Sequence, residues 1–389
     1  MGQVTGEETG FIDASGWLLS SRAPVETFYR MAGCSFLLRG SGGLVEHVRR
    51  ECRSLAVPML PSVDIEFDFR RQLPSMPSYS LAGTIKIGAS YYEARSGRVS
   101  YQVHSTADGF LVYVLNDVPR RRPIPNPIRR FHDWNFQVPE ENAAKDFLYG
   151  VFGYLTQLVN MRRGCSYLHA SSFERRGEGI ALIAWRGIGK TAAMLKLVGE
   201  HGWNYLSDDL AVIGPPRELS RSAQRIQLYA YNLAGEDNLT RRIFSHRSYW
   251  DRCAWEFRKH WHGVGQTRRR VDAEELFGEA AVSVRATLRS PVLMERSNVS
   301  GFEMEPISTA ELAHRSAYII LRELESLVEI ASAVNAFGPG FGAMAPDIFL
   351  TETSDLLEDR FEGLAASRLR IPIEATAASL AEYLQATFG

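Results

Sequence analysis

The stretch GIALIAWRGIGKTAAMLKLV, Gly179 to Val198, decides how this chain is interpreted. It reads as an apolar strand, a glycine-containing loop and a helix that opens with Lys190 and Thr191. Phosphate-binding loops have this order and the pattern G-x-x-x-x-G-K-[ST]. Ala184 stands where that pattern has its first glycine, so the stretch departs from it at one defining position.

The residues after the strand carry chemistry suited to a phosphate. Backbone N–H groups freed by Gly187, Ile188 and Gly189 can form a nest for the β-phosphate at the positive end of the following helix. Lys190 would neutralise the β- and γ-phosphates of ATP, and Thr191 would offer its hydroxyl to Mg²⁺. Only five of the 44 basic residues are lysine, so a lysine is less expected in the glycine loop by chance, and this favours a functional role for Lys190.

Ala184 weakens the loop only under one backbone geometry. If the position needs a positive φ, alanine costs about 1 kcal/mol, whereas in an extended strand it costs almost nothing. We expect the loop to persist in both cases.

Two further segments supply acidic and imidazole groups. The segment LSDDLAV places Asp208 and Asp209 at the end of a short apolar strand that follows the helix. One carboxylate can hold Mg²⁺, for which Asp208 is our candidate, and either can accept a proton from an attacking hydroxyl. His169, in YLHASSF, lies on the strand before the glycine loop. A lone histidine in a strand is more often a packed core residue, so its role depends on its neighbours.

These segments together resemble the HPr kinase/phosphorylase family over about 45 residues, from Tyr167 to Ile213. That family has a histidine on the preceding strand, a loop G-x-S-G-x-G-K-[ST] and a strand ending in Asp-Asp, and Gly187 matches its additional glycine. The resemblance implies nucleotide binding by the loop, an active-site histidine, and an acidic pair for Mg²⁺ and proton transfer. The matching positions are Gly187, Gly189, Lys190, Thr191, His169, Asp208 and Asp209.

The resemblance also implies a fold and an activity. The fold would be an α/β P-loop kinase core related to ATP-dependent phosphoenolpyruvate carboxykinase, and the activity would be phosphorylation of a serine hydroxyl on a protein or peptide. Relatives of this type occur beside biosynthetic genes for ribosomally made peptides. Ala184 and Arg186 depart from the family loop, and the chain has no counterpart of the segment E-x-R-G-x-G. HPr itself is therefore not the expected acceptor, and phosphorylase activity stays open.

A basic triplet in GQTRRRVD follows a glycine-containing stretch. Arg268 and Arg270, with Arg269 between them, could neutralise charge on a transferred phosphoryl group. A solvated basic loop explains the triplet equally well.

The rest of the chain predicts three regions. Residues 1–117 form a domain rich in antiparallel strands, with a hairpin turning at Ser96-Gly97. Residues 118–139 form a Pro/Arg-rich linker, and residues 140–389 form the P-loop domain. Within that domain we expect a helix over 139–164, a helix from about 310 to 331 behind a Ser308/Glu311 capping box, and a last helix capped by Thr376.

Composition narrows the class of protein. A chain of 389 residues with 45% hydrophobic content can bury a sizeable core, and a net charge of −1 gives no overall attraction to nucleic acid or an anionic membrane. Its four cysteines include no C-x-x-C pair, which argues against a structural zinc site or a disulfide framework. The N-terminus does not read as a secretory signal. We expect a soluble cytoplasmic protein without nucleic-acid or membrane partners.

The leading hypothesis is a Mg-ATP-dependent kinase acting on a serine or threonine hydroxyl of a peptide or protein. A small-molecule alcohol as acceptor stays open, because no motif identifies the acceptor. The alternative from another class is a sensor or interaction protein that binds ATP without transferring phosphate, which Ala184 and Arg186 favour. Homo-oligomerisation is left open by the sequence.

Overall fold

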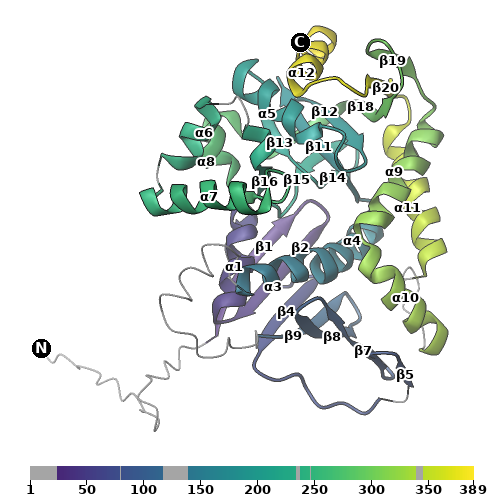
Figure 1. Cartoon of the computed structure of the whole chain (residues 1–389). Coiled ribbons are helices and arrows are strands. Elements are labelled where there is room, and N and C mark those ends of the chain that lie inside the picture. The colour runs from purple at the N-terminus through teal and green to yellow at the C-terminus, as the bar shows by residue number, and fades with distance from the viewer. Residues whose placement is uncertain (1–23, 79, 117–138, 234–236, 246, 339–344) are drawn as a thin grey trace, which may run out of the picture.

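The computed structural model describes residues 24–78, 80–116, 139–233, 237–245, 247–338 and 345–389 (Figure 1). The chain forms a mixed α/β structure with two large sheets. The expected Pro/Arg-rich linker lies outside the described residues, except for Pro139 at the start of a helix.

The N-terminal sheet has the strand order β3-β1-β2-β4-β9-β8-β7-β6-β5. Buried side chains alternate with half-buried ones along its strands, as in β9, where Phe110, Val112 and Val114 are buried. The elements are β1 Val25–Met31, β2 Cys34–Gly40, α1 Gly43–Glu51, the 3₁₀ turn Arg53–Leu55, β3 Ala56–Val57, β4 Ile65–Arg70, β5 Ser80–Ala82, β6 Ile85–Ile87, β7 Tyr91–Ser96, β8 Val99–Ser105 and β9 Phe110–Leu115.

The expectation of antiparallel pairing holds for β7, β8 and β9 but is wrong for the middle of this sheet. Strand β4 runs parallel to both β2 and β9. The physical reason is connectivity, because α1 returns the chain from the end of β2 to the start of β4, as a parallel crossover requires. The expected hairpin between β7 and β8 is present, with Ser96 paired to Val99 and the turn at Gly97 and Arg98, where Gly97 has a φ of 56°.

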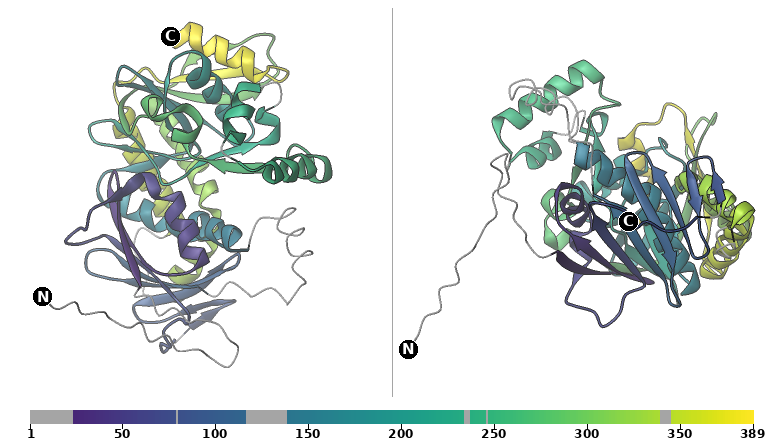
Figure 2. Two further views of the ribbon diagram at one scale, coloured as in Figure 1. Left: turned by 90° about the vertical axis from the view of Figure 1, so that its left-hand side faces the viewer. Right: turned by 90° about the horizontal axis from the view of Figure 1, so that it is seen from below.

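A long helix connects the two sheets and covers the expected range closely. It comprises α3 Pro139–Phe147, a π-helical turn Leu148–Phe152 and α4 Gly153–Arg162. In Figures 1 and 2 it crosses between the sheets. Phe147 and Phe152 pack edge-to-face against Phe67 and Phe36 of the N-terminal sheet, with ring centroids 5.1 and 4.9 Å apart. One hydrophobic core therefore spans both sheets, and the division into domains at 118–139 stays a prediction.

The second sheet has the order β10-β14-β15-β18-β12-β11-β13, and β20 pairs with both β18 and β19. Its parallel part is β12-β18-β20, and helices α5 and α12 pack together at its upper end in Figure 1. The elements are β10 Ser166–Leu168, β11 Ala170–Arg175, β12 Glu178–Ala184, α5 Lys190–Glu200, β13 Asn204–Ser207, β14 Ala211–Gly214, β15 Glu218–Arg221, β18 Arg285–Ser297, β19 Glu303–Pro306, β20 Ser367–Pro372 and α12 Ala377–Phe388.

Further elements surround this sheet. A two-stranded ribbon, β16 with β17, borders the space between the sheets, and α6, α7 and α8 lie beside it (Figure 1). The bounds are β16 Ile226–Tyr229, the 3₁₀ turn Ala230–Leu233, α6 Asp237–Phe244, α7 Tyr249–His262, β17 Arg268–Val271, α8 Ala273–Phe277, the 3₁₀ turn Glu279–Ala281, α9 Thr309–Glu323, α10 Glu325–Phe337 and α11 Pro346–Phe361.

Two helix predictions can be compared with these bounds. The helix expected over 310–331 begins behind Ser308, whose hydroxyl accepts a hydrogen bond from the Glu311 N–H, but it ends at Glu323 and a second helix follows. No glycine or proline marks this interruption, which lies at Leu324, a buried residue packed beside Gly153. Tertiary packing rather than a local signal divides the helix. The cap of the last helix at Thr376 is confirmed.

Candidate functional site

The glycine loop joins the end of β12 to the start of α5. Gly187 and Gly189 have φ values of 79° and 113°, a region that non-glycine residues enter at a cost. Gly189 is the N-cap of α5 and supplies no side-chain hydrogen bond to its first turn, so the N–H groups there can be donated to an anion. The loop therefore has the backbone of an anion nest.

Ala184 does not disturb this loop. It is the last residue of β12, fully buried and paired with Met294 of the parallel strand β18. An extended backbone accepts alanine without strain, which resolves the question that the sequence left open. The departure from the phosphate-loop pattern therefore has no backbone cost.

Lys190, the first residue of α5, is buried against its own loop. Its ammonium group donates hydrogen bonds to the carbonyls of Ala184 at 2.8 Å and Trp185 at 3.1 Å. Burial lowers its pKa, while the nearby carboxylates, Asp209 first, act in the opposite direction. The cation is thus held at the base of the glycine loop.

Thr191 and Asp208 meet beside this lysine. The Thr191 hydroxyl lies 3.0 and 3.1 Å from the two carboxylate oxygens of Asp208, and the Ser171 hydroxyl also donates to that carboxylate. Burial, and then the negative charge of Asp209, raise the pKa of Asp208 to about 6, against the hydrogen bonds from Ser171 and Thr191 and the charge of Lys190. A buried carboxylate with a neighbouring hydroxyl is a suitable pair of oxygen ligands for a hard cation.

Breaks in two strands bring His169 and the aspartate pair to this site. Leu168 pairs with β14 and Ala170 with β12, so the chain changes partner at His169. It changes partner again between β13 and β14, where Asp208 and Asp209 lie. The sequence predicted one strand through His169, which the change of partner interrupts, whereas the short strand expected to end at the aspartate pair does end just before it, at Ser207.

Asp209 differs from Asp208 in exposure and backbone. It has a φ of 63°, a left-handed conformation that aspartate tolerates better than most residues, and it lines the cleft described below. The two neighbouring carboxylates therefore differ: Asp208 is buried, and Asp209 is half-buried and borders the cleft.

His169 is an unusual buried group. Its side chain is 4% exposed, and neither Nδ1 nor Nε2 has a hydrogen-bond partner among the described residues. Burial, and then the positive charges of Lys190 and Arg186, hold its pKa well below the ordinary value. Buried polar groups are normally hydrogen-bonded. A neutral imidazole that borders a cleft and has no partner of this kind therefore indicates that a ligand binds in the cleft and supplies one.

The cleft has a volume of about 840 Å³, within the range of ligand pockets. One wall is the glycine loop with His169 and Asp209, and the opposite wall comes from the helix that begins with α3, from the β16–β17 ribbon and from the end of α9. The lining residues are Ser96, Lys145, Asp146, Tyr149, Gly150, His169, Arg186, Gly187, Ile188, Gly189, Lys190, Thr191, Ala192, Asp209, Gln227, Tyr229, Tyr231, Asn232, Gly265, Arg268, Arg322 and Glu323.

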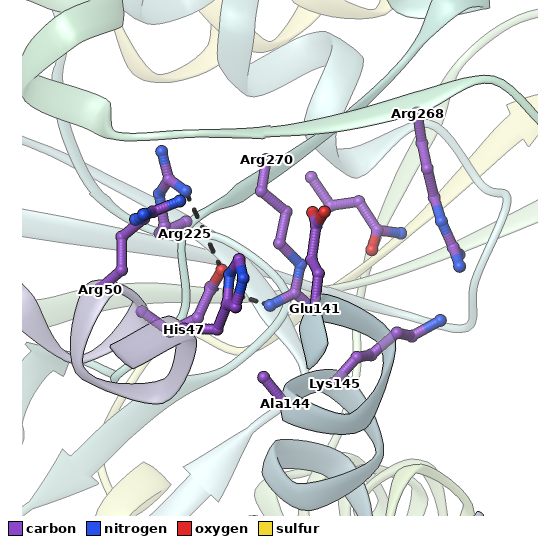
Figure 3. Close-up of a pocket in the computed structure, with 10 residues that line it drawn as sticks. His47, Arg50, Glu141, Ala144, Lys145, Arg225, Arg268 and Arg270 are labelled. Carbon is purple, nitrogen blue, oxygen red and sulfur yellow. Dashed lines mark ion pairs between the residues drawn. The ribbon is translucent and has the colours of Figure 1, made fainter. Parts of the chain in front are cut away.

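The arginine triplet is not a solvated loop, as the sequence allowed, but the strand β17. Because successive side chains of a strand point to opposite faces, the three have different partners. Arg268 lines the cleft. Arg269 points away and forms two hydrogen bonds of 2.7 Å with Asp251. Arg270 lies 2.8 Å from Glu51 and lines a smaller pocket shown in Figure 3, so its proposed contact with a nucleotide stays a prediction.

Sequence reasoning missed several residues of the cleft. Ser171, whose hydroxyl donates to Asp208 beside the cleft, follows the histidine by two positions, and this close spacing was an available signal. Lys145 is one of only five lysines, and this rarity was a second signal. Tyr229 and Tyr231 stack with ring centroids 5.2 Å apart in the cleft wall, and no local pattern predicts that contact.

The fold and site define a mixed α/β protein in which the glycine loop, Thr191, Asp209 and His169 border one cleft, with Asp208 buried behind Thr191. No protein-family model matches the chain, and no curated protein sequence matches it. Among solved structures, it is similar to the HPr(Ser) kinase/phosphatase from Coxiella burnetii, with a TM-score of 0.28 and 11% identity over 57% of this chain and 87% of that one. A likeness this low carries no argument about activity, so the reasoning below depends on the site.

No helix within the described ranges combines the length and apolar character needed to cross a bilayer.

Proposed function

We propose that this protein is a Mg-ATP-dependent kinase that transfers the γ-phosphate to a serine or threonine hydroxyl of a peptide or protein. The observation that carries the proposal is the contact of Thr191 with Asp208 at the start of α5, beside Lys190 and below two glycines of positive φ. This combination of a cation, an anion nest and two hard oxygen ligands suits a nucleotide triphosphate with its metal.

The residues present fit the phosphates of ATP. Gly187 and Gly189 hold the loop open, as a Cβ at Gly187 would meet no atom within 4 Å while still straining the backbone. Lys190 would turn from the carbonyls of Ala184 and Trp185 to the β- and γ-phosphates. The unpartnered nitrogens of His169 would then have an acceptor or donor within the cleft.

They also fit Mg²⁺. Within the described residues, no group of three or more His, Cys, Asp or Glu side chains could hold a metal by itself. Magnesium in kinase sites is usually held by one or two protein oxygens together with substrate phosphates, and Thr191 with Asp208 supplies that number. When bound, Mg²⁺ would neutralise charge that develops on the phosphoryl oxygens.

The geometry favours a division of roles between the two aspartates. Asp208 is buried and bonded to two hydroxyls, which suits a metal ligand. Asp209 lines the cleft, which suits a group that accepts the proton of the attacking hydroxyl. His169, kept neutral by its surroundings, would orient the phosphoryl group or the acceptor by a hydrogen bond.

Transfer of labelled phosphate from ATP tests the proposal. The full chain would be incubated with Mg²⁺ and serine-containing peptides or proteins, including small peptides encoded beside this gene. Asp209→Asn should reduce transfer by about 10²-fold or more, because it removes a general base. Asp355→Asn, an exposed residue on α11, is the matched control and should act as wild type.

The same experiment separates the kinase from an ATP-binding sensor. Lys190→Ala should abolish ATP binding in both cases, so binding alone does not decide between them. Tight ATP binding by the wild type without transfer to any acceptor would favour the sensor, and equal transfer by wild type and Asp209→Asn would remove the proposed base.

A further inference from the structure

A small basic pocket lies where helices α1 and α3 meet the β16–β17 ribbon (Figure 3). Its volume is about 30 Å³, enough for a compact group rather than a whole substrate. We call it the basic pocket, and its lining residues are His47, Arg50, Glu51, Glu141, Ala144, Lys145, Arg225, Gln227, Arg268 and Arg270.

The basic pocket adjoins the candidate kinase cleft. Lys145, Gln227 and Arg268 line both spaces, so a molecule in the cleft and a group in the pocket would contact the same side chains. Lys145 comes from α3 and Arg268 comes from β17, and both are labelled among the lining residues in Figure 3. The pocket is thus a neighbour of the cleft, built from elements other than the glycine loop.

Two of its arginines are neutralised within the protein. Arg270 lies 2.8 Å from a Glu51 oxygen, and Arg225 forms hydrogen bonds of 2.9 and 3.1 Å with Asp272. Arg225 also lies 4.0 Å from a Glu51 oxygen, and dashed lines in Figure 3 mark ion pairs made by Arg225 and Arg270. These ion pairs fix the position of the two arginines in the pocket wall. Because each arginine is balanced by a carboxylate, the two add little net positive charge to the pocket.

Three other cations have no such partner. Arg50, Lys145 and Arg268 form no ion pair with any carboxylate of the described residues, although all three line the pocket. Burial, and then the positive charges of Arg268 and Arg270, lower the pKa of Lys145 to about 8. Like charges brought together in a partly desolvated space repel each other, and an anion of the right size would relieve that repulsion.

We propose that the basic pocket binds an anionic group, a carboxylate or a phosphate, of the acceptor whose hydroxyl is phosphorylated. The inference rests on the proposed kinase function and names its substrate class: a hydroxyl compound with a nearby negative charge. The glycine loop has its own lysine and helix terminus for the nucleotide, so Lys145 and Arg268, which line both the cleft and the pocket, are available to the acceptor together with Arg50 of the pocket. An acidic side chain or terminus beside a serine, or the carboxylate of a small hydroxy acid, has the required chemistry.

Binding without turnover tests this proposal independently of catalysis. The full chain would be saturated with Mg²⁺ and a non-hydrolysable ATP analogue, which occupies the glycine loop. Calorimetry would then compare acetyl-Glu-Ser-Glu-amide with acetyl-Gln-Ser-Gln-amide. We expect the acidic peptide to bind about tenfold more tightly, the effect of one or two charge-assisted hydrogen bonds. Competition by glycerate would show whether a small hydroxy acid suffices.

Arg50 is the informative position because it is exposed, has no ion pair to lose and does not line the cleft itself. Arg50→Gln should reduce the ratio of the acidic peptide's affinity to the neutral peptide's affinity toward one. Arg50→Lys should restore most of that ratio. Arg30→Gln is the matched control, since Arg30 is an exposed arginine of β1 outside both pockets. An unchanged preference in Arg50→Gln, or no binding of either peptide or glycerate, would overturn the proposal.

The two proposals fail in different ways. Selective binding of the acidic peptide without phosphate transfer would remove the kinase function but keep the anion site. Phosphate transfer to the acidic and neutral peptides with equal affinity would keep the kinase and remove the anion site.

Discussion

Asp208→Asn should make the protein more stable while it removes Mg²⁺-dependent activity. The Asp208 carboxylate is buried, and its pKa of about 6 lies well above the ordinary value of 3.8. A rise of about 2 corresponds to about 3 kcal/mol in favour of the protonated form, so the ionised carboxylate destabilises the fold by that amount at neutral pH. An asparagine carries no charge, and its amide keeps partners for the hydroxyls of Ser171 and Thr191.

The sign of the pH dependence follows from the raised pKa. The contribution that favours the fold is fully present below 3.8 and is lost as the pH rises through about 6. The advantage of Asp208→Asn over wild type should therefore be about 3 kcal/mol at pH 8 and about half of that at pH 5. For 389 residues this gives a melting temperature about 3–4 °C higher at pH 8.

Thermal and urea unfolding at the two pH values measure this difference. Asp209→Asn should raise stability less, because burial rather than the charge of Asp209 is the largest cause of the raised pKa. Asp355→Asn should leave it unchanged. A variant Asp208→Asn that melts at or below the wild-type temperature at pH 8, or one whose advantage grows toward pH 5, would refute the reasoning.

Three further predictions concern the loop and the triplet. Gly187→Ala should lower stability by about 1–2 kcal/mol and weaken ATP binding, since its φ of 79° disfavours a Cβ; urea unfolding and nucleotide titration check this. Ala184→Gly, which restores the phosphate-loop pattern, should not improve ATP affinity and should cost about 0.5–1 kcal/mol, because the position is a buried strand; a clear gain in affinity would contradict its extended geometry. Arg269→Gln should lower the free energy of unfolding by about 1–3 kcal/mol through the lost bonds to Asp251, yet leave nucleotide affinity intact. Arg268→Gln should lower phosphate transfer with little change in stability. The reverse pattern would show that the strand faces were assigned wrongly.

The sequence predicted much of the candidate site because its chemistry is local. Glycines that need a positive φ, a lysine and threonine at the start of a helix, and adjacent acids after a short strand are each recognisable from neighbouring residues. Lys190 and Thr191 do open α5, and Asp209 does border the cleft with the glycine loop. Hairpins and caps were predictable for the same reason, as Thr376 illustrates.

Other features could not be read from neighbouring residues. The parallel pairing of β4 depends on where α1 returns the chain, and the interruption of a helix at Leu324 depends on packing against Gly153. The sequence of one segment does not determine which distant strand it pairs with or in which register. The partner changes at His169 and Asp208 are of this kind, since each depends on which strand lies beside it.

By itself, the sequence determined the types of group that this protein can offer a ligand: an anion nest, a cation, a hydroxyl, two carboxylates and an imidazole. The tertiary structure decided their states, because burial and neighbouring charge are not local properties. It placed Ala184 in a strand, buried Asp208 and left Asp209 half-buried at the cleft, and it gave the His169 ring no hydrogen-bond partner among the described residues. It also assembled the basic pocket from α1, α3 and the β16–β17 ribbon, segments that only folding brings into contact.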